Sequence, residues 1–254
     1  MSNFNGQVVL ITGAASGIGR ATALRMAKVG ANLALSDINP ASLDETRQQC
    51  ESVSKKSTQQ HMASRVDVQS TESINDFVQS VVSRYGTIHH VFNCAGINPT
   101  KLEIEQITDA YWHKLMDTNV KSIMTMTRAC VPHMSRGASF VNVSSMCGIY
   151  PTALFSVYCA TKFAVIGFSK CMALELGARG IRVNVVAPGS IDTPTNASVL
   201  AGGDRLQQMA EGVGLKRAGT AEEVADVVAF LFSDESRYVN GSVVQIDGGL
   251  GLPG

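Results

Sequence analysis

Two side chains four residues apart could together move a proton. Tyr158 and Lys162 stand in the segment 156–162, SVYCATK, and residues at this spacing share one face of a helix. A tyrosine with its ordinary pKa of about 10 is a poor base near neutral pH. A neighbouring ammonium group favours the phenolate and lowers that pKa. Such a pair could take the proton of an alcohol, or return one to a carbonyl oxygen. The same spacing also occurs where a surface tyrosine lies beside a solvated lysine.

Two further polar positions could complete this site. The segment 142–146, NVSSM, ends an apolar run shortly before Tyr158, and a serine hydroxyl there could hold a substrate oxygen against the phenol. Asn119 lies inside a long helical pattern, where asparagine is neither a good helix former nor a natural cap. We therefore expect a local bend at Asn119 that holds a water and relays protons to Lys162.

A glycine-rich turn points to a phosphate-bearing ligand. The segment 12–19, TGAASGIG, follows an apolar run and opens a helical pattern, with the spacing Gly-x-x-x-Gly-x-Gly. Glycines at such a corner let the backbone approach a pyrophosphate, whose charge lies against the amides at the helix N-terminus. The alternative is a tight turn with no ligand. The expected contacts are Gly13, Ser16, Gly17, Ile18 and Gly19.

An acidic residue follows at an informative distance. Asp37 lies 18 residues after Gly19, close to the offset of roughly 20 residues at which an acid binds the adenosine ribose of a dinucleotide. Its carboxylate would repel a 2′-phosphate, and neither Ser16 nor the pair Ile38–Asn39 supplies a compensating Lys or Arg. We predict NAD in preference to NADP. A helix-capping or turn role for Asp37 is the alternative.

Two more strand ends could line the same cleft. Asp67 and Val68 end one short apolar segment, and Asn93, Ala95 and Gly96 end another. Ligands bind at the carboxyl edge in sheets of this type. Asp67 could reach an adenine ring, and Ala95 with Gly96 would keep side chains out of the cofactor's path. Each segment could equally be an ordinary turn.

The elements that must position these residues alternate between strand and helix. Apolar runs predict strands at 8–11, 32–37, 64–68, 90–93, 139–143, 182–187 and 242–246. Helical patterns occupy 17–29, 40–53, a segment after Ser70, 109–134, 158–177 and a segment opened by the capping box at Thr220. This alternation predicts a doubly wound, Rossmann-type α/β fold with helices on both faces of a parallel sheet. We expect one domain over 1–254, with a substrate flap at about 190–214.

Composition excludes several classes of function. The 254 residues include 21 Lys+Arg and 21 Asp+Glu, so no net field favours nucleic acid or an anionic membrane. We see no apolar stretch of about 20 residues and no secretory signal at the N-terminus. The six cysteines contain no CxxC pair, and the five histidines offer no ligand spacing. We therefore expect a cytoplasmic protein with reduced thiols and no metal site.

Taken together, these motifs resemble the short-chain dehydrogenase/reductase family in its single-domain form of about 250 residues. The resemblance extends over residues 8–249 and implies a seven-stranded parallel sheet. It also implies roles for four catalytic residues. Tyr158 would be the acid/base and Lys162 would lower the phenol pKa and hold the nicotinamide ribose. Ser145, which lies 13 residues before Tyr158, would position substrate, and Asn119 would keep the relay water.

The resemblance adds further expectations. Residues 188–193, PGSIDT, are similar to the turn that holds the nicotinamide, through Pro188, Gly189, Ile191 and Thr193. Cys94 departs from the family's usual asparagine. The implied assembly is a homotetramer built on the two long helices, with a dimer as the alternative.

The function predicted from these residues is an NAD(H)-dependent oxidoreductase. It would interconvert a secondary alcohol and a ketone on a neutral, fairly hydrophobic small molecule. The substrate would lie against Ser145, Cys147, Ile149, Phe155 and Tyr158. The alternatives are a non-redox isomerase, dehydratase or cyclase on the same scaffold, an NADP(H)-dependent ketoreductase, and a dinucleotide-sensing protein without catalysis.

Overall fold

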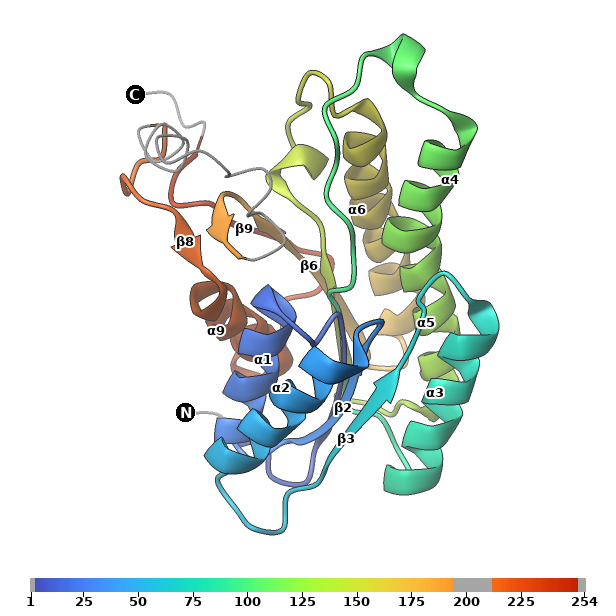
Figure 1. Cartoon of the computed structure of the whole chain (residues 1–254). Coiled ribbons are helices and arrows are strands. Elements are labelled where there is room, and N and C mark those ends of the chain that lie inside the picture. The colour runs from blue at the N-terminus through green and yellow to red at the C-terminus, as the bar shows by residue number, and fades with distance from the viewer. Residues whose placement is uncertain (1–2, 194–211, 251–254) are drawn as a thin grey trace.

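Seven parallel strands form the centre of the molecule in a computed structural model that describes residues 3–193 and 212–250 (Figure 1). Their order across the sheet is β3-β2-β1-β4-β5-β6-β9. The bounds are β1 Val8–Thr12, β2 Asn32–Asp37, β3 His61–Arg65, β4 His90–Asn93, β5 Ser139–Val143, β6 Arg182–Pro188 and β9 Val243–Ile246. Two short strands, β7 Ile191–Asp192 and β8 Gly219–Thr220, pair beside it. The predicted seven-stranded, doubly wound sheet is confirmed.

Helices cover both faces of this sheet, as Figure 1 shows. One layer contains α1 Gly17–Lys28, α2 Pro40–Val53 and α9 Ala221–Phe232. The other contains α3 Thr71–Tyr85, α5 Ser122–Cys130 and α6 Ser156–Gly177, with α4 Asp109–Met116 preceding α5. Shorter helical turns are η1 Ile104–Gln106, η2 Asp117–Lys121, η3 Val131–His133, η4 Met146–Gly148 and η6 Asp234–Ser236.

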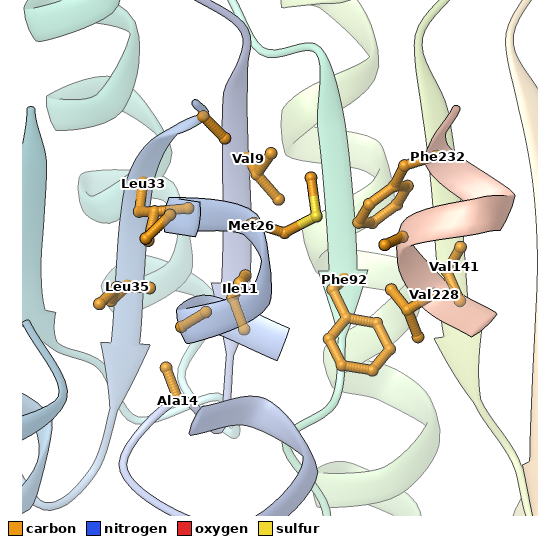
Figure 2. Close-up of a cluster of buried hydrophobic side chains, with 14 of the residues drawn as sticks. Val9, Ile11, Ala14, Met26, Leu33, Leu35, Phe92, Val141, Val228 and Phe232 are labelled. Atoms are coloured by element: carbon orange, nitrogen blue, oxygen red, sulfur yellow. The ribbon is translucent and has the colours of Figure 1, made fainter. Parts of the chain in front are cut away.

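Alternate strand residues supply the two halves of the core. In β1, Val9 and Ile11 belong to the cluster under α1, α2 and α9, whereas Val8 and Leu10 belong to the cluster under α3, α5 and α6. Successive side chains of a strand point to opposite faces, so a strand covered on both sides must be apolar throughout. Figure 2 shows the first cluster, in which Met26 lies among the side chains of several strands.

The third strand lies earlier than predicted. The sequence favoured 64–68, whereas β3 spans His61–Arg65 and pairs with β2 from Leu33 to Asp37. β3 is an edge strand in which only the first residue is buried, so it lacks the apolar signature of the inner strands. The apolar Val66 enters the core just beyond the strand end and therefore misled the prediction.

The long helix predicted at 109–134 is interrupted. α4 runs into the π-helical turn η2 at Asp117–Lys121, then into α5, which ends at Cys130. Asn119 lies within η2, so the bend expected there is present. Beyond Cys130 the chain tightens into the 3-10 turn η3, which contains Pro132, a residue that cannot donate to a continuing helical ladder.

One helix corrects an expectation about apolar length. Among the described residues, α6 is long and apolar enough to cross a membrane by length and composition alone. It packs against β5 and β6 in the sheet and carries the buried side chains of Tyr158 and Lys162. These contacts identify it as a sheet-covering helix, a class that commonly meets the same length and composition test.

Candidate functional site

A cavity of about 410 Å³ opens at the carboxyl edge of the sheet. Loops following β1, β2, β3, β4, β5 and β6 all contribute to its wall, because parallel strands end at the same edge. Among the predicted cofactor residues it is lined by Gly13, Ser16, Gly17, Ile18, Gly19, Asp37, Ile38, Asp67, Val68, Ala95, Gly96, Tyr158, Lys162, Pro188, Gly189, Ile191 and Thr193. Ser145 lines it as well.

The glycine-rich turn brings two backbones into close approach. Gly13 has a φ of +69°, and a Cβ placed on it would lie 2.9 Å from Ala95 backbone atoms. The Thr12 hydroxyl fastens the two loops, since it accepts the Cys94 N–H at 3.1 Å and the Ala95 N–H at 3.0 Å. The turn therefore exposes backbone rather than side chains at the N-terminus of α1. These residues fit the pyrophosphate of a dinucleotide.

Asp37 lines the same cavity at the end of β2. One carboxylate oxygen accepts the Ala15 N–H and the other accepts the Asn39 N–H, each at 3.0 Å. A carboxylate has about four acceptor sites in all, so both oxygens keep capacity for ribose hydroxyls. The two backbone bonds hold the carboxylate at the cavity wall. The turn role considered for Asp37 and the ligand role are therefore compatible.

Tyr158 and Ser145 meet inside the cavity. Tyr158 is buried on α6, close to the side chain of Ser145. Burial raises the pKa of Tyr158 above its usual value, and the Ser145 side chain opposes that rise. We expected a lowered pKa from the neighbouring lysine. In this chain desolvation of the phenolate outweighs other influences, so the phenol holds its proton at neutral pH.

Lys162 points into the same region. Its ammonium donates to the Val143 carbonyl at 3.1 Å and lies 5.5 Å from the centroid of the Tyr158 ring. The side chain is only 6% exposed, and burial lowers the pKa of Lys162 from 10.5 to about 8. The lysine is therefore still largely charged at pH 7, and that charge has been removed from water.

Asn119 is held by hydrogen bonds to the loop after β4 and to α6. Its side-chain oxygen accepts the Ile97 N–H at 2.9 Å, and its amide donates to the Ile97 carbonyl at 3.1 Å and to the Thr161 hydroxyl at 3.4 Å. Asn119 is almost completely buried. The π turn thus presents a side chain that ties the loop after β4 to α6, one residue before Lys162.

The choice between the two serines is supported by their contacts. The Ser144 hydroxyl donates to the Lys162 carbonyl at 2.9 Å and is buried under α6. Ser145 instead caps the turn η4, where its hydroxyl accepts the Cys147 N–H at 3.1 Å. Both serines line the cavity, and Ser145 is the one whose side chain influences the pKa of Tyr158.

Comparison with known proteins decides the family. A family model described as Enoyl-(Acyl carrier protein) reductase matches residues 13–251. The 3-oxoacyl-(acyl-carrier-protein) reductase FabG of Thermotoga maritima is 40% identical over 252 residues, covering 96% of this chain and 98% of the relative. The chain belongs to the short-chain dehydrogenase/reductase family.

Other relatives of the family span the same length. The cyclohexanol dehydrogenase of an Acinetobacter species is 35% identical, over 98% of this chain and 96% of the relative. The crystal structure of a short chain dehydrogenase from Burkholderia cenocepacia in complex with NADP has a TM-score of 0.90 at 29% identity. It covers 97% of this chain and 98% of that chain. Proteins named for different activities therefore share this short-chain dehydrogenase/reductase architecture.

One prediction about the site needs adjustment, and another falls outside the described residues. Asn93 lies outside the cavity lining, because its amide donates to the Asn142 side chain at 2.8 Å and Asn142 donates in turn to Ser169 at 2.8 Å. It therefore joins β4, β5 and α6 in the interior. The predicted flap at 190–214 lies outside the described residues between 194 and 211.

The predicted substrate residues divide into two groups. Cys147 and Phe155 pack against the buried side chains of Leu115, Val157 and Tyr158 and form an apolar wall beside the phenol. Ile149 ends the turn η4 and is half-buried, with its N–H donated to the Met146 carbonyl. Partly buried residues that sequence reasoning missed extend the wall, namely Ile107 and Tyr111.

Arg20 is the most informative residue that sequence reasoning missed. It lines a shallow hollow with Asp37 and Ser42, on the outer side of the glycine-rich turn. Its position one helical turn after Ser16 could have indicated this. Its guanidinium is already engaged, because it donates to the Thr46 hydroxyl at 2.9 Å, to the Ser42 carbonyl at 3.1 Å and to Glu45 at 3.3 Å.

Proposed function

We propose that this protein is an NAD(H)-dependent oxidoreductase that interconverts a secondary alcohol and a ketone on a neutral, fairly hydrophobic small molecule. The observation that carries the proposal is the meeting of Tyr158, Ser145 and Lys162 in one cavity with the glycine-rich turn. A nicotinamide bound there supplies or accepts the hydride. The side chains of this chain provide the proton and the orientation.

The protonated phenol of Tyr158 is in the state that ketone reduction requires. The substrate oxygen would accept hydrogen bonds from Ser145 and Tyr158, and the protonated phenol is a general acid for the alkoxide that forms. Oxidation requires the phenolate, which the charge of Lys162 favours. Asn119 would hold the loop at Ile97 against Thr161 of α6. We also propose that Asn119 keeps the water that relays protons to Lys162.

The apolar wall supports the substrate class. Besides Tyr158, the cluster around the phenol consists of Leu115, Val157, Ile97, Ile107, Tyr111, Cys147 and Phe155, none of which carries a formal charge at neutral pH. A phosphorylated or carboxylate-bearing substrate would have to be desolvated there without a partner. The name of one relative, cyclohexanol dehydrogenase, describes a neutral cyclic alcohol and fits this class.

NAD is the proposed cofactor because Asp37 occupies the ribose position and the nearby Arg20 is engaged by other groups. An NADP(H)-dependent ketoreductase is the second candidate. It is favoured by the NADP complex of the Burkholderia relative, and Arg20 would have to leave Glu45 to meet a 2′-phosphate. We further propose a homotetramer, supported by the exposed apolar side chains Phe163 and Leu174 on α6. Cytoplasmic location stays a prediction.

The test follows nicotinamide absorbance while the enzyme meets hydrophobic secondary alcohols or ketones with NAD(H) and, separately, with NADP(H). Tyr158→Phe should reduce turnover by roughly 100-fold or more, the range of a lost general acid, with cofactor affinity largely kept. Tyr238→Phe, at a fully exposed tyrosine, is the matched control. Substantial turnover in Tyr158→Phe would remove the assigned acid. Cofactor binding without net turnover in the wild type would favour the non-redox alternatives.

The cofactor preference has its own variant. Asp37→Ser removes an acceptor whose charged hydrogen bonds to ribose contribute about 1.5–3 kcal/mol, so NAD affinity should fall roughly 10–100-fold while NADP affinity rises. Asp76→Ser, at an exposed helical aspartate, should change neither. Unchanged preference in Asp37→Ser would contradict the NAD assignment.

A further inference from the structure

Two cysteines flank the proposed proton donor on its apolar side. Cys147 lies in η4, two residues after Ser145, and Cys159 lies on α6, next to Tyr158. Both are free thiols. Their side chains interact with each other, and each of them raises the pKa of the Tyr158 phenol.

Thr152 joins the two thiols. Its hydroxyl lies 3.5 Å from the Cys147 sulfur, and its backbone N–H points to the Cys159 sulfur at 3.5 Å. The Cys159 thiol also lies 3.9 Å from the Thr152 carbonyl. A single residue in the loop between η4 and α6 therefore keeps both sulfurs together, without a covalent bond.

We propose that Cys147 and Cys159 form a reversible disulfide on exposure to hydrogen peroxide, and that this bond switches off the neighbouring site. Cys147 is the half-buried member and meets the oxidant first, whereas Cys159 is buried behind it. The inactivation rests on the proposed function of Tyr158 and Ser145, but formation of the disulfide does not.

The reaction balances with one peroxide for each pair of thiols. The Cys147 sulfur attacks one peroxide oxygen, the O–O bond breaks, and a sulfenic acid and one water result. The Cys159 sulfur then attacks the Cys147 sulfur. The S–O bond breaks, and the hydroxide leaves as a second water with the Cys159 proton. Two thiols are oxidised by two electrons, and the peroxide is reduced to two waters.

The consequence for the site follows from the hydrogen bonds. The Cys147 N–H is donated to the Ser145 hydroxyl at 3.1 Å, so movement of Cys147 displaces the hydroxyl that faces Tyr158. A disulfide also requires the two Cβ atoms to lie about 3.8 Å apart. Two thiols that are only in van der Waals contact allow a longer distance between their Cβ atoms. The bond would therefore draw η4 against α6 and narrow the apolar wall.

The other thiols provide internal comparisons. Burial raises the pKa of Cys94 and Cys50 to about 12 and also raises the pKa of Cys130 and Cys159, so the first attack on the peroxide belongs to the half-buried Cys147 and Cys159 acts only in the second step. Cys171 is exposed on α6. It reports general oxidation, and it is too far along the helix to substitute for Cys159.

The sequence makes the experiment direct. Residues 137–162 contain no internal Lys or Arg, and Cys147 and Cys159 are their only cysteines. The intact protein is treated with hydrogen peroxide, its free thiols are alkylated, and trypsin releases this segment as one peptide. The expected peptide lacks two hydrogen atoms and carries no alkyl group. Chymotrypsin then cuts between the cysteines, and the halves should separate only after reduction.

Variants decide the outcome. Cys159→Ala should give no linked peptide, whereas Cys171→Ala should form the link as the wild type does. Turnover of the oxidised wild type should fall at least tenfold and return with a dithiol reductant, while Cys159→Ala should keep its own untreated rate. Full alkylation of both cysteines under conditions that oxidise Cys171 would overturn the proposal. A disulfide that forms without loss of turnover would overturn the proposed inactivation. If the protein shows no turnover with any substrate, the peptide mass still tests whether the disulfide forms.

Discussion

The buried lysine gives a prediction in which stability and activity move in opposite directions. Replacing Lys162 by Met keeps the length of the side chain and removes its charge. The pKa of Lys162 falls from 10.5 to about 8 because of burial. At about 1.36 kcal/mol per pKa unit, the charged form destabilises the folded state by about 3 kcal/mol. The variant loses the hydrogen bond to the Val143 carbonyl, which contributes about 1 kcal/mol.

The net expectation is that Lys162→Met is more stable than the wild type by about 2 kcal/mol at pH 7. For a chain of this length that corresponds to a rise in melting temperature of roughly 4–8 °C. Turnover should be nearly abolished, because the group proposed to favour the phenolate and hold the ribose is gone. Lys170→Met, at an exposed position on the same helix, should change stability by less than about 0.5 kcal/mol.

The pH dependence of the stability difference shows whether the buried charge of Lys162 is its cause. Below about pH 8 the amine is charged in both states, so the wild type bears the full cost of burial. Between about 8 and 10.5 the unfolded chain binds more protons than the folded chain, so wild-type stability rises with pH. The advantage of Lys162→Met should therefore shrink over this interval and, above it, give way to a deficit of about 1 kcal/mol from the lost hydrogen bond.

Urea unfolding of the cofactor-free protein, at equal concentrations and at several pH values, measures these differences. The two-state assumption is checked by agreement between fluorescence and circular dichroism. A variant that is less stable than the wild type at pH 7 would refute the reasoning. So would an advantage that stays constant from pH 7 to pH 10.5.

Three further predictions concern binding, the interior and acid stability. Gly13→Ala should weaken cofactor binding at least tenfold in a titration followed by fluorescence, because its Cβ would meet the Ala95 backbone; unchanged affinity would contradict the close approach. Asn142→Leu should lower the free energy of unfolding by about 2 kcal/mol or more, since the buried amide of Asn93 loses its acceptor; an unaffected urea midpoint would show that the amide finds another partner. The pKa of Glu223 is lowered from 4.5 to about 2 by its arginine partner and by the backbone of the helix cap, so its contribution is present above pH 4.5 and lost as pH falls to 2. Glu223→Gln should flatten an acid-unfolding curve in that interval, and an unchanged curve would deny the pairing a role.

The inner strands could be predicted from sequence because burial on both faces favours apolar residues at successive positions, as in Val8–Ile11 of β1. The motifs at their ends follow from chain order, since parallel strands bring Gly13, Asp37 and Tyr158 to one edge. The edge strand β3 lacked that signal. The engagement of Arg20 and the inward turn of Asn93 depend on contacts between segments far apart in sequence, which no local pattern contains.

Side-chain energetics were the least predictable part of the site. Tyr158 and Lys162 share a helix face as their spacing predicts, but their pKa values depend on how much water the finished fold excludes. Likewise, the contact between Cys147 and Cys159 depends on the loop that carries Thr152. Sequence spacing within one helix identifies which side chains are neighbours. Their burial depends on how the helices and the sheet pack together, which the spacing does not show.

The π turn has a consequence for how this helical segment can change through insertion and deletion. A π turn contains one residue more than the α-helical turn it replaces. Deleting one residue within Asp117–Lys121 would therefore let α4 and α5 join as a regular helix, with α5 still packed on the sheet and Leu115 of α4 still packed against α6. Such a deletion improves backbone geometry and removes the widened turn that directs Asn119 to Ile97. In this chain the residue that makes the helix irregular is therefore the one that lets Asn119 reach the loop after β4.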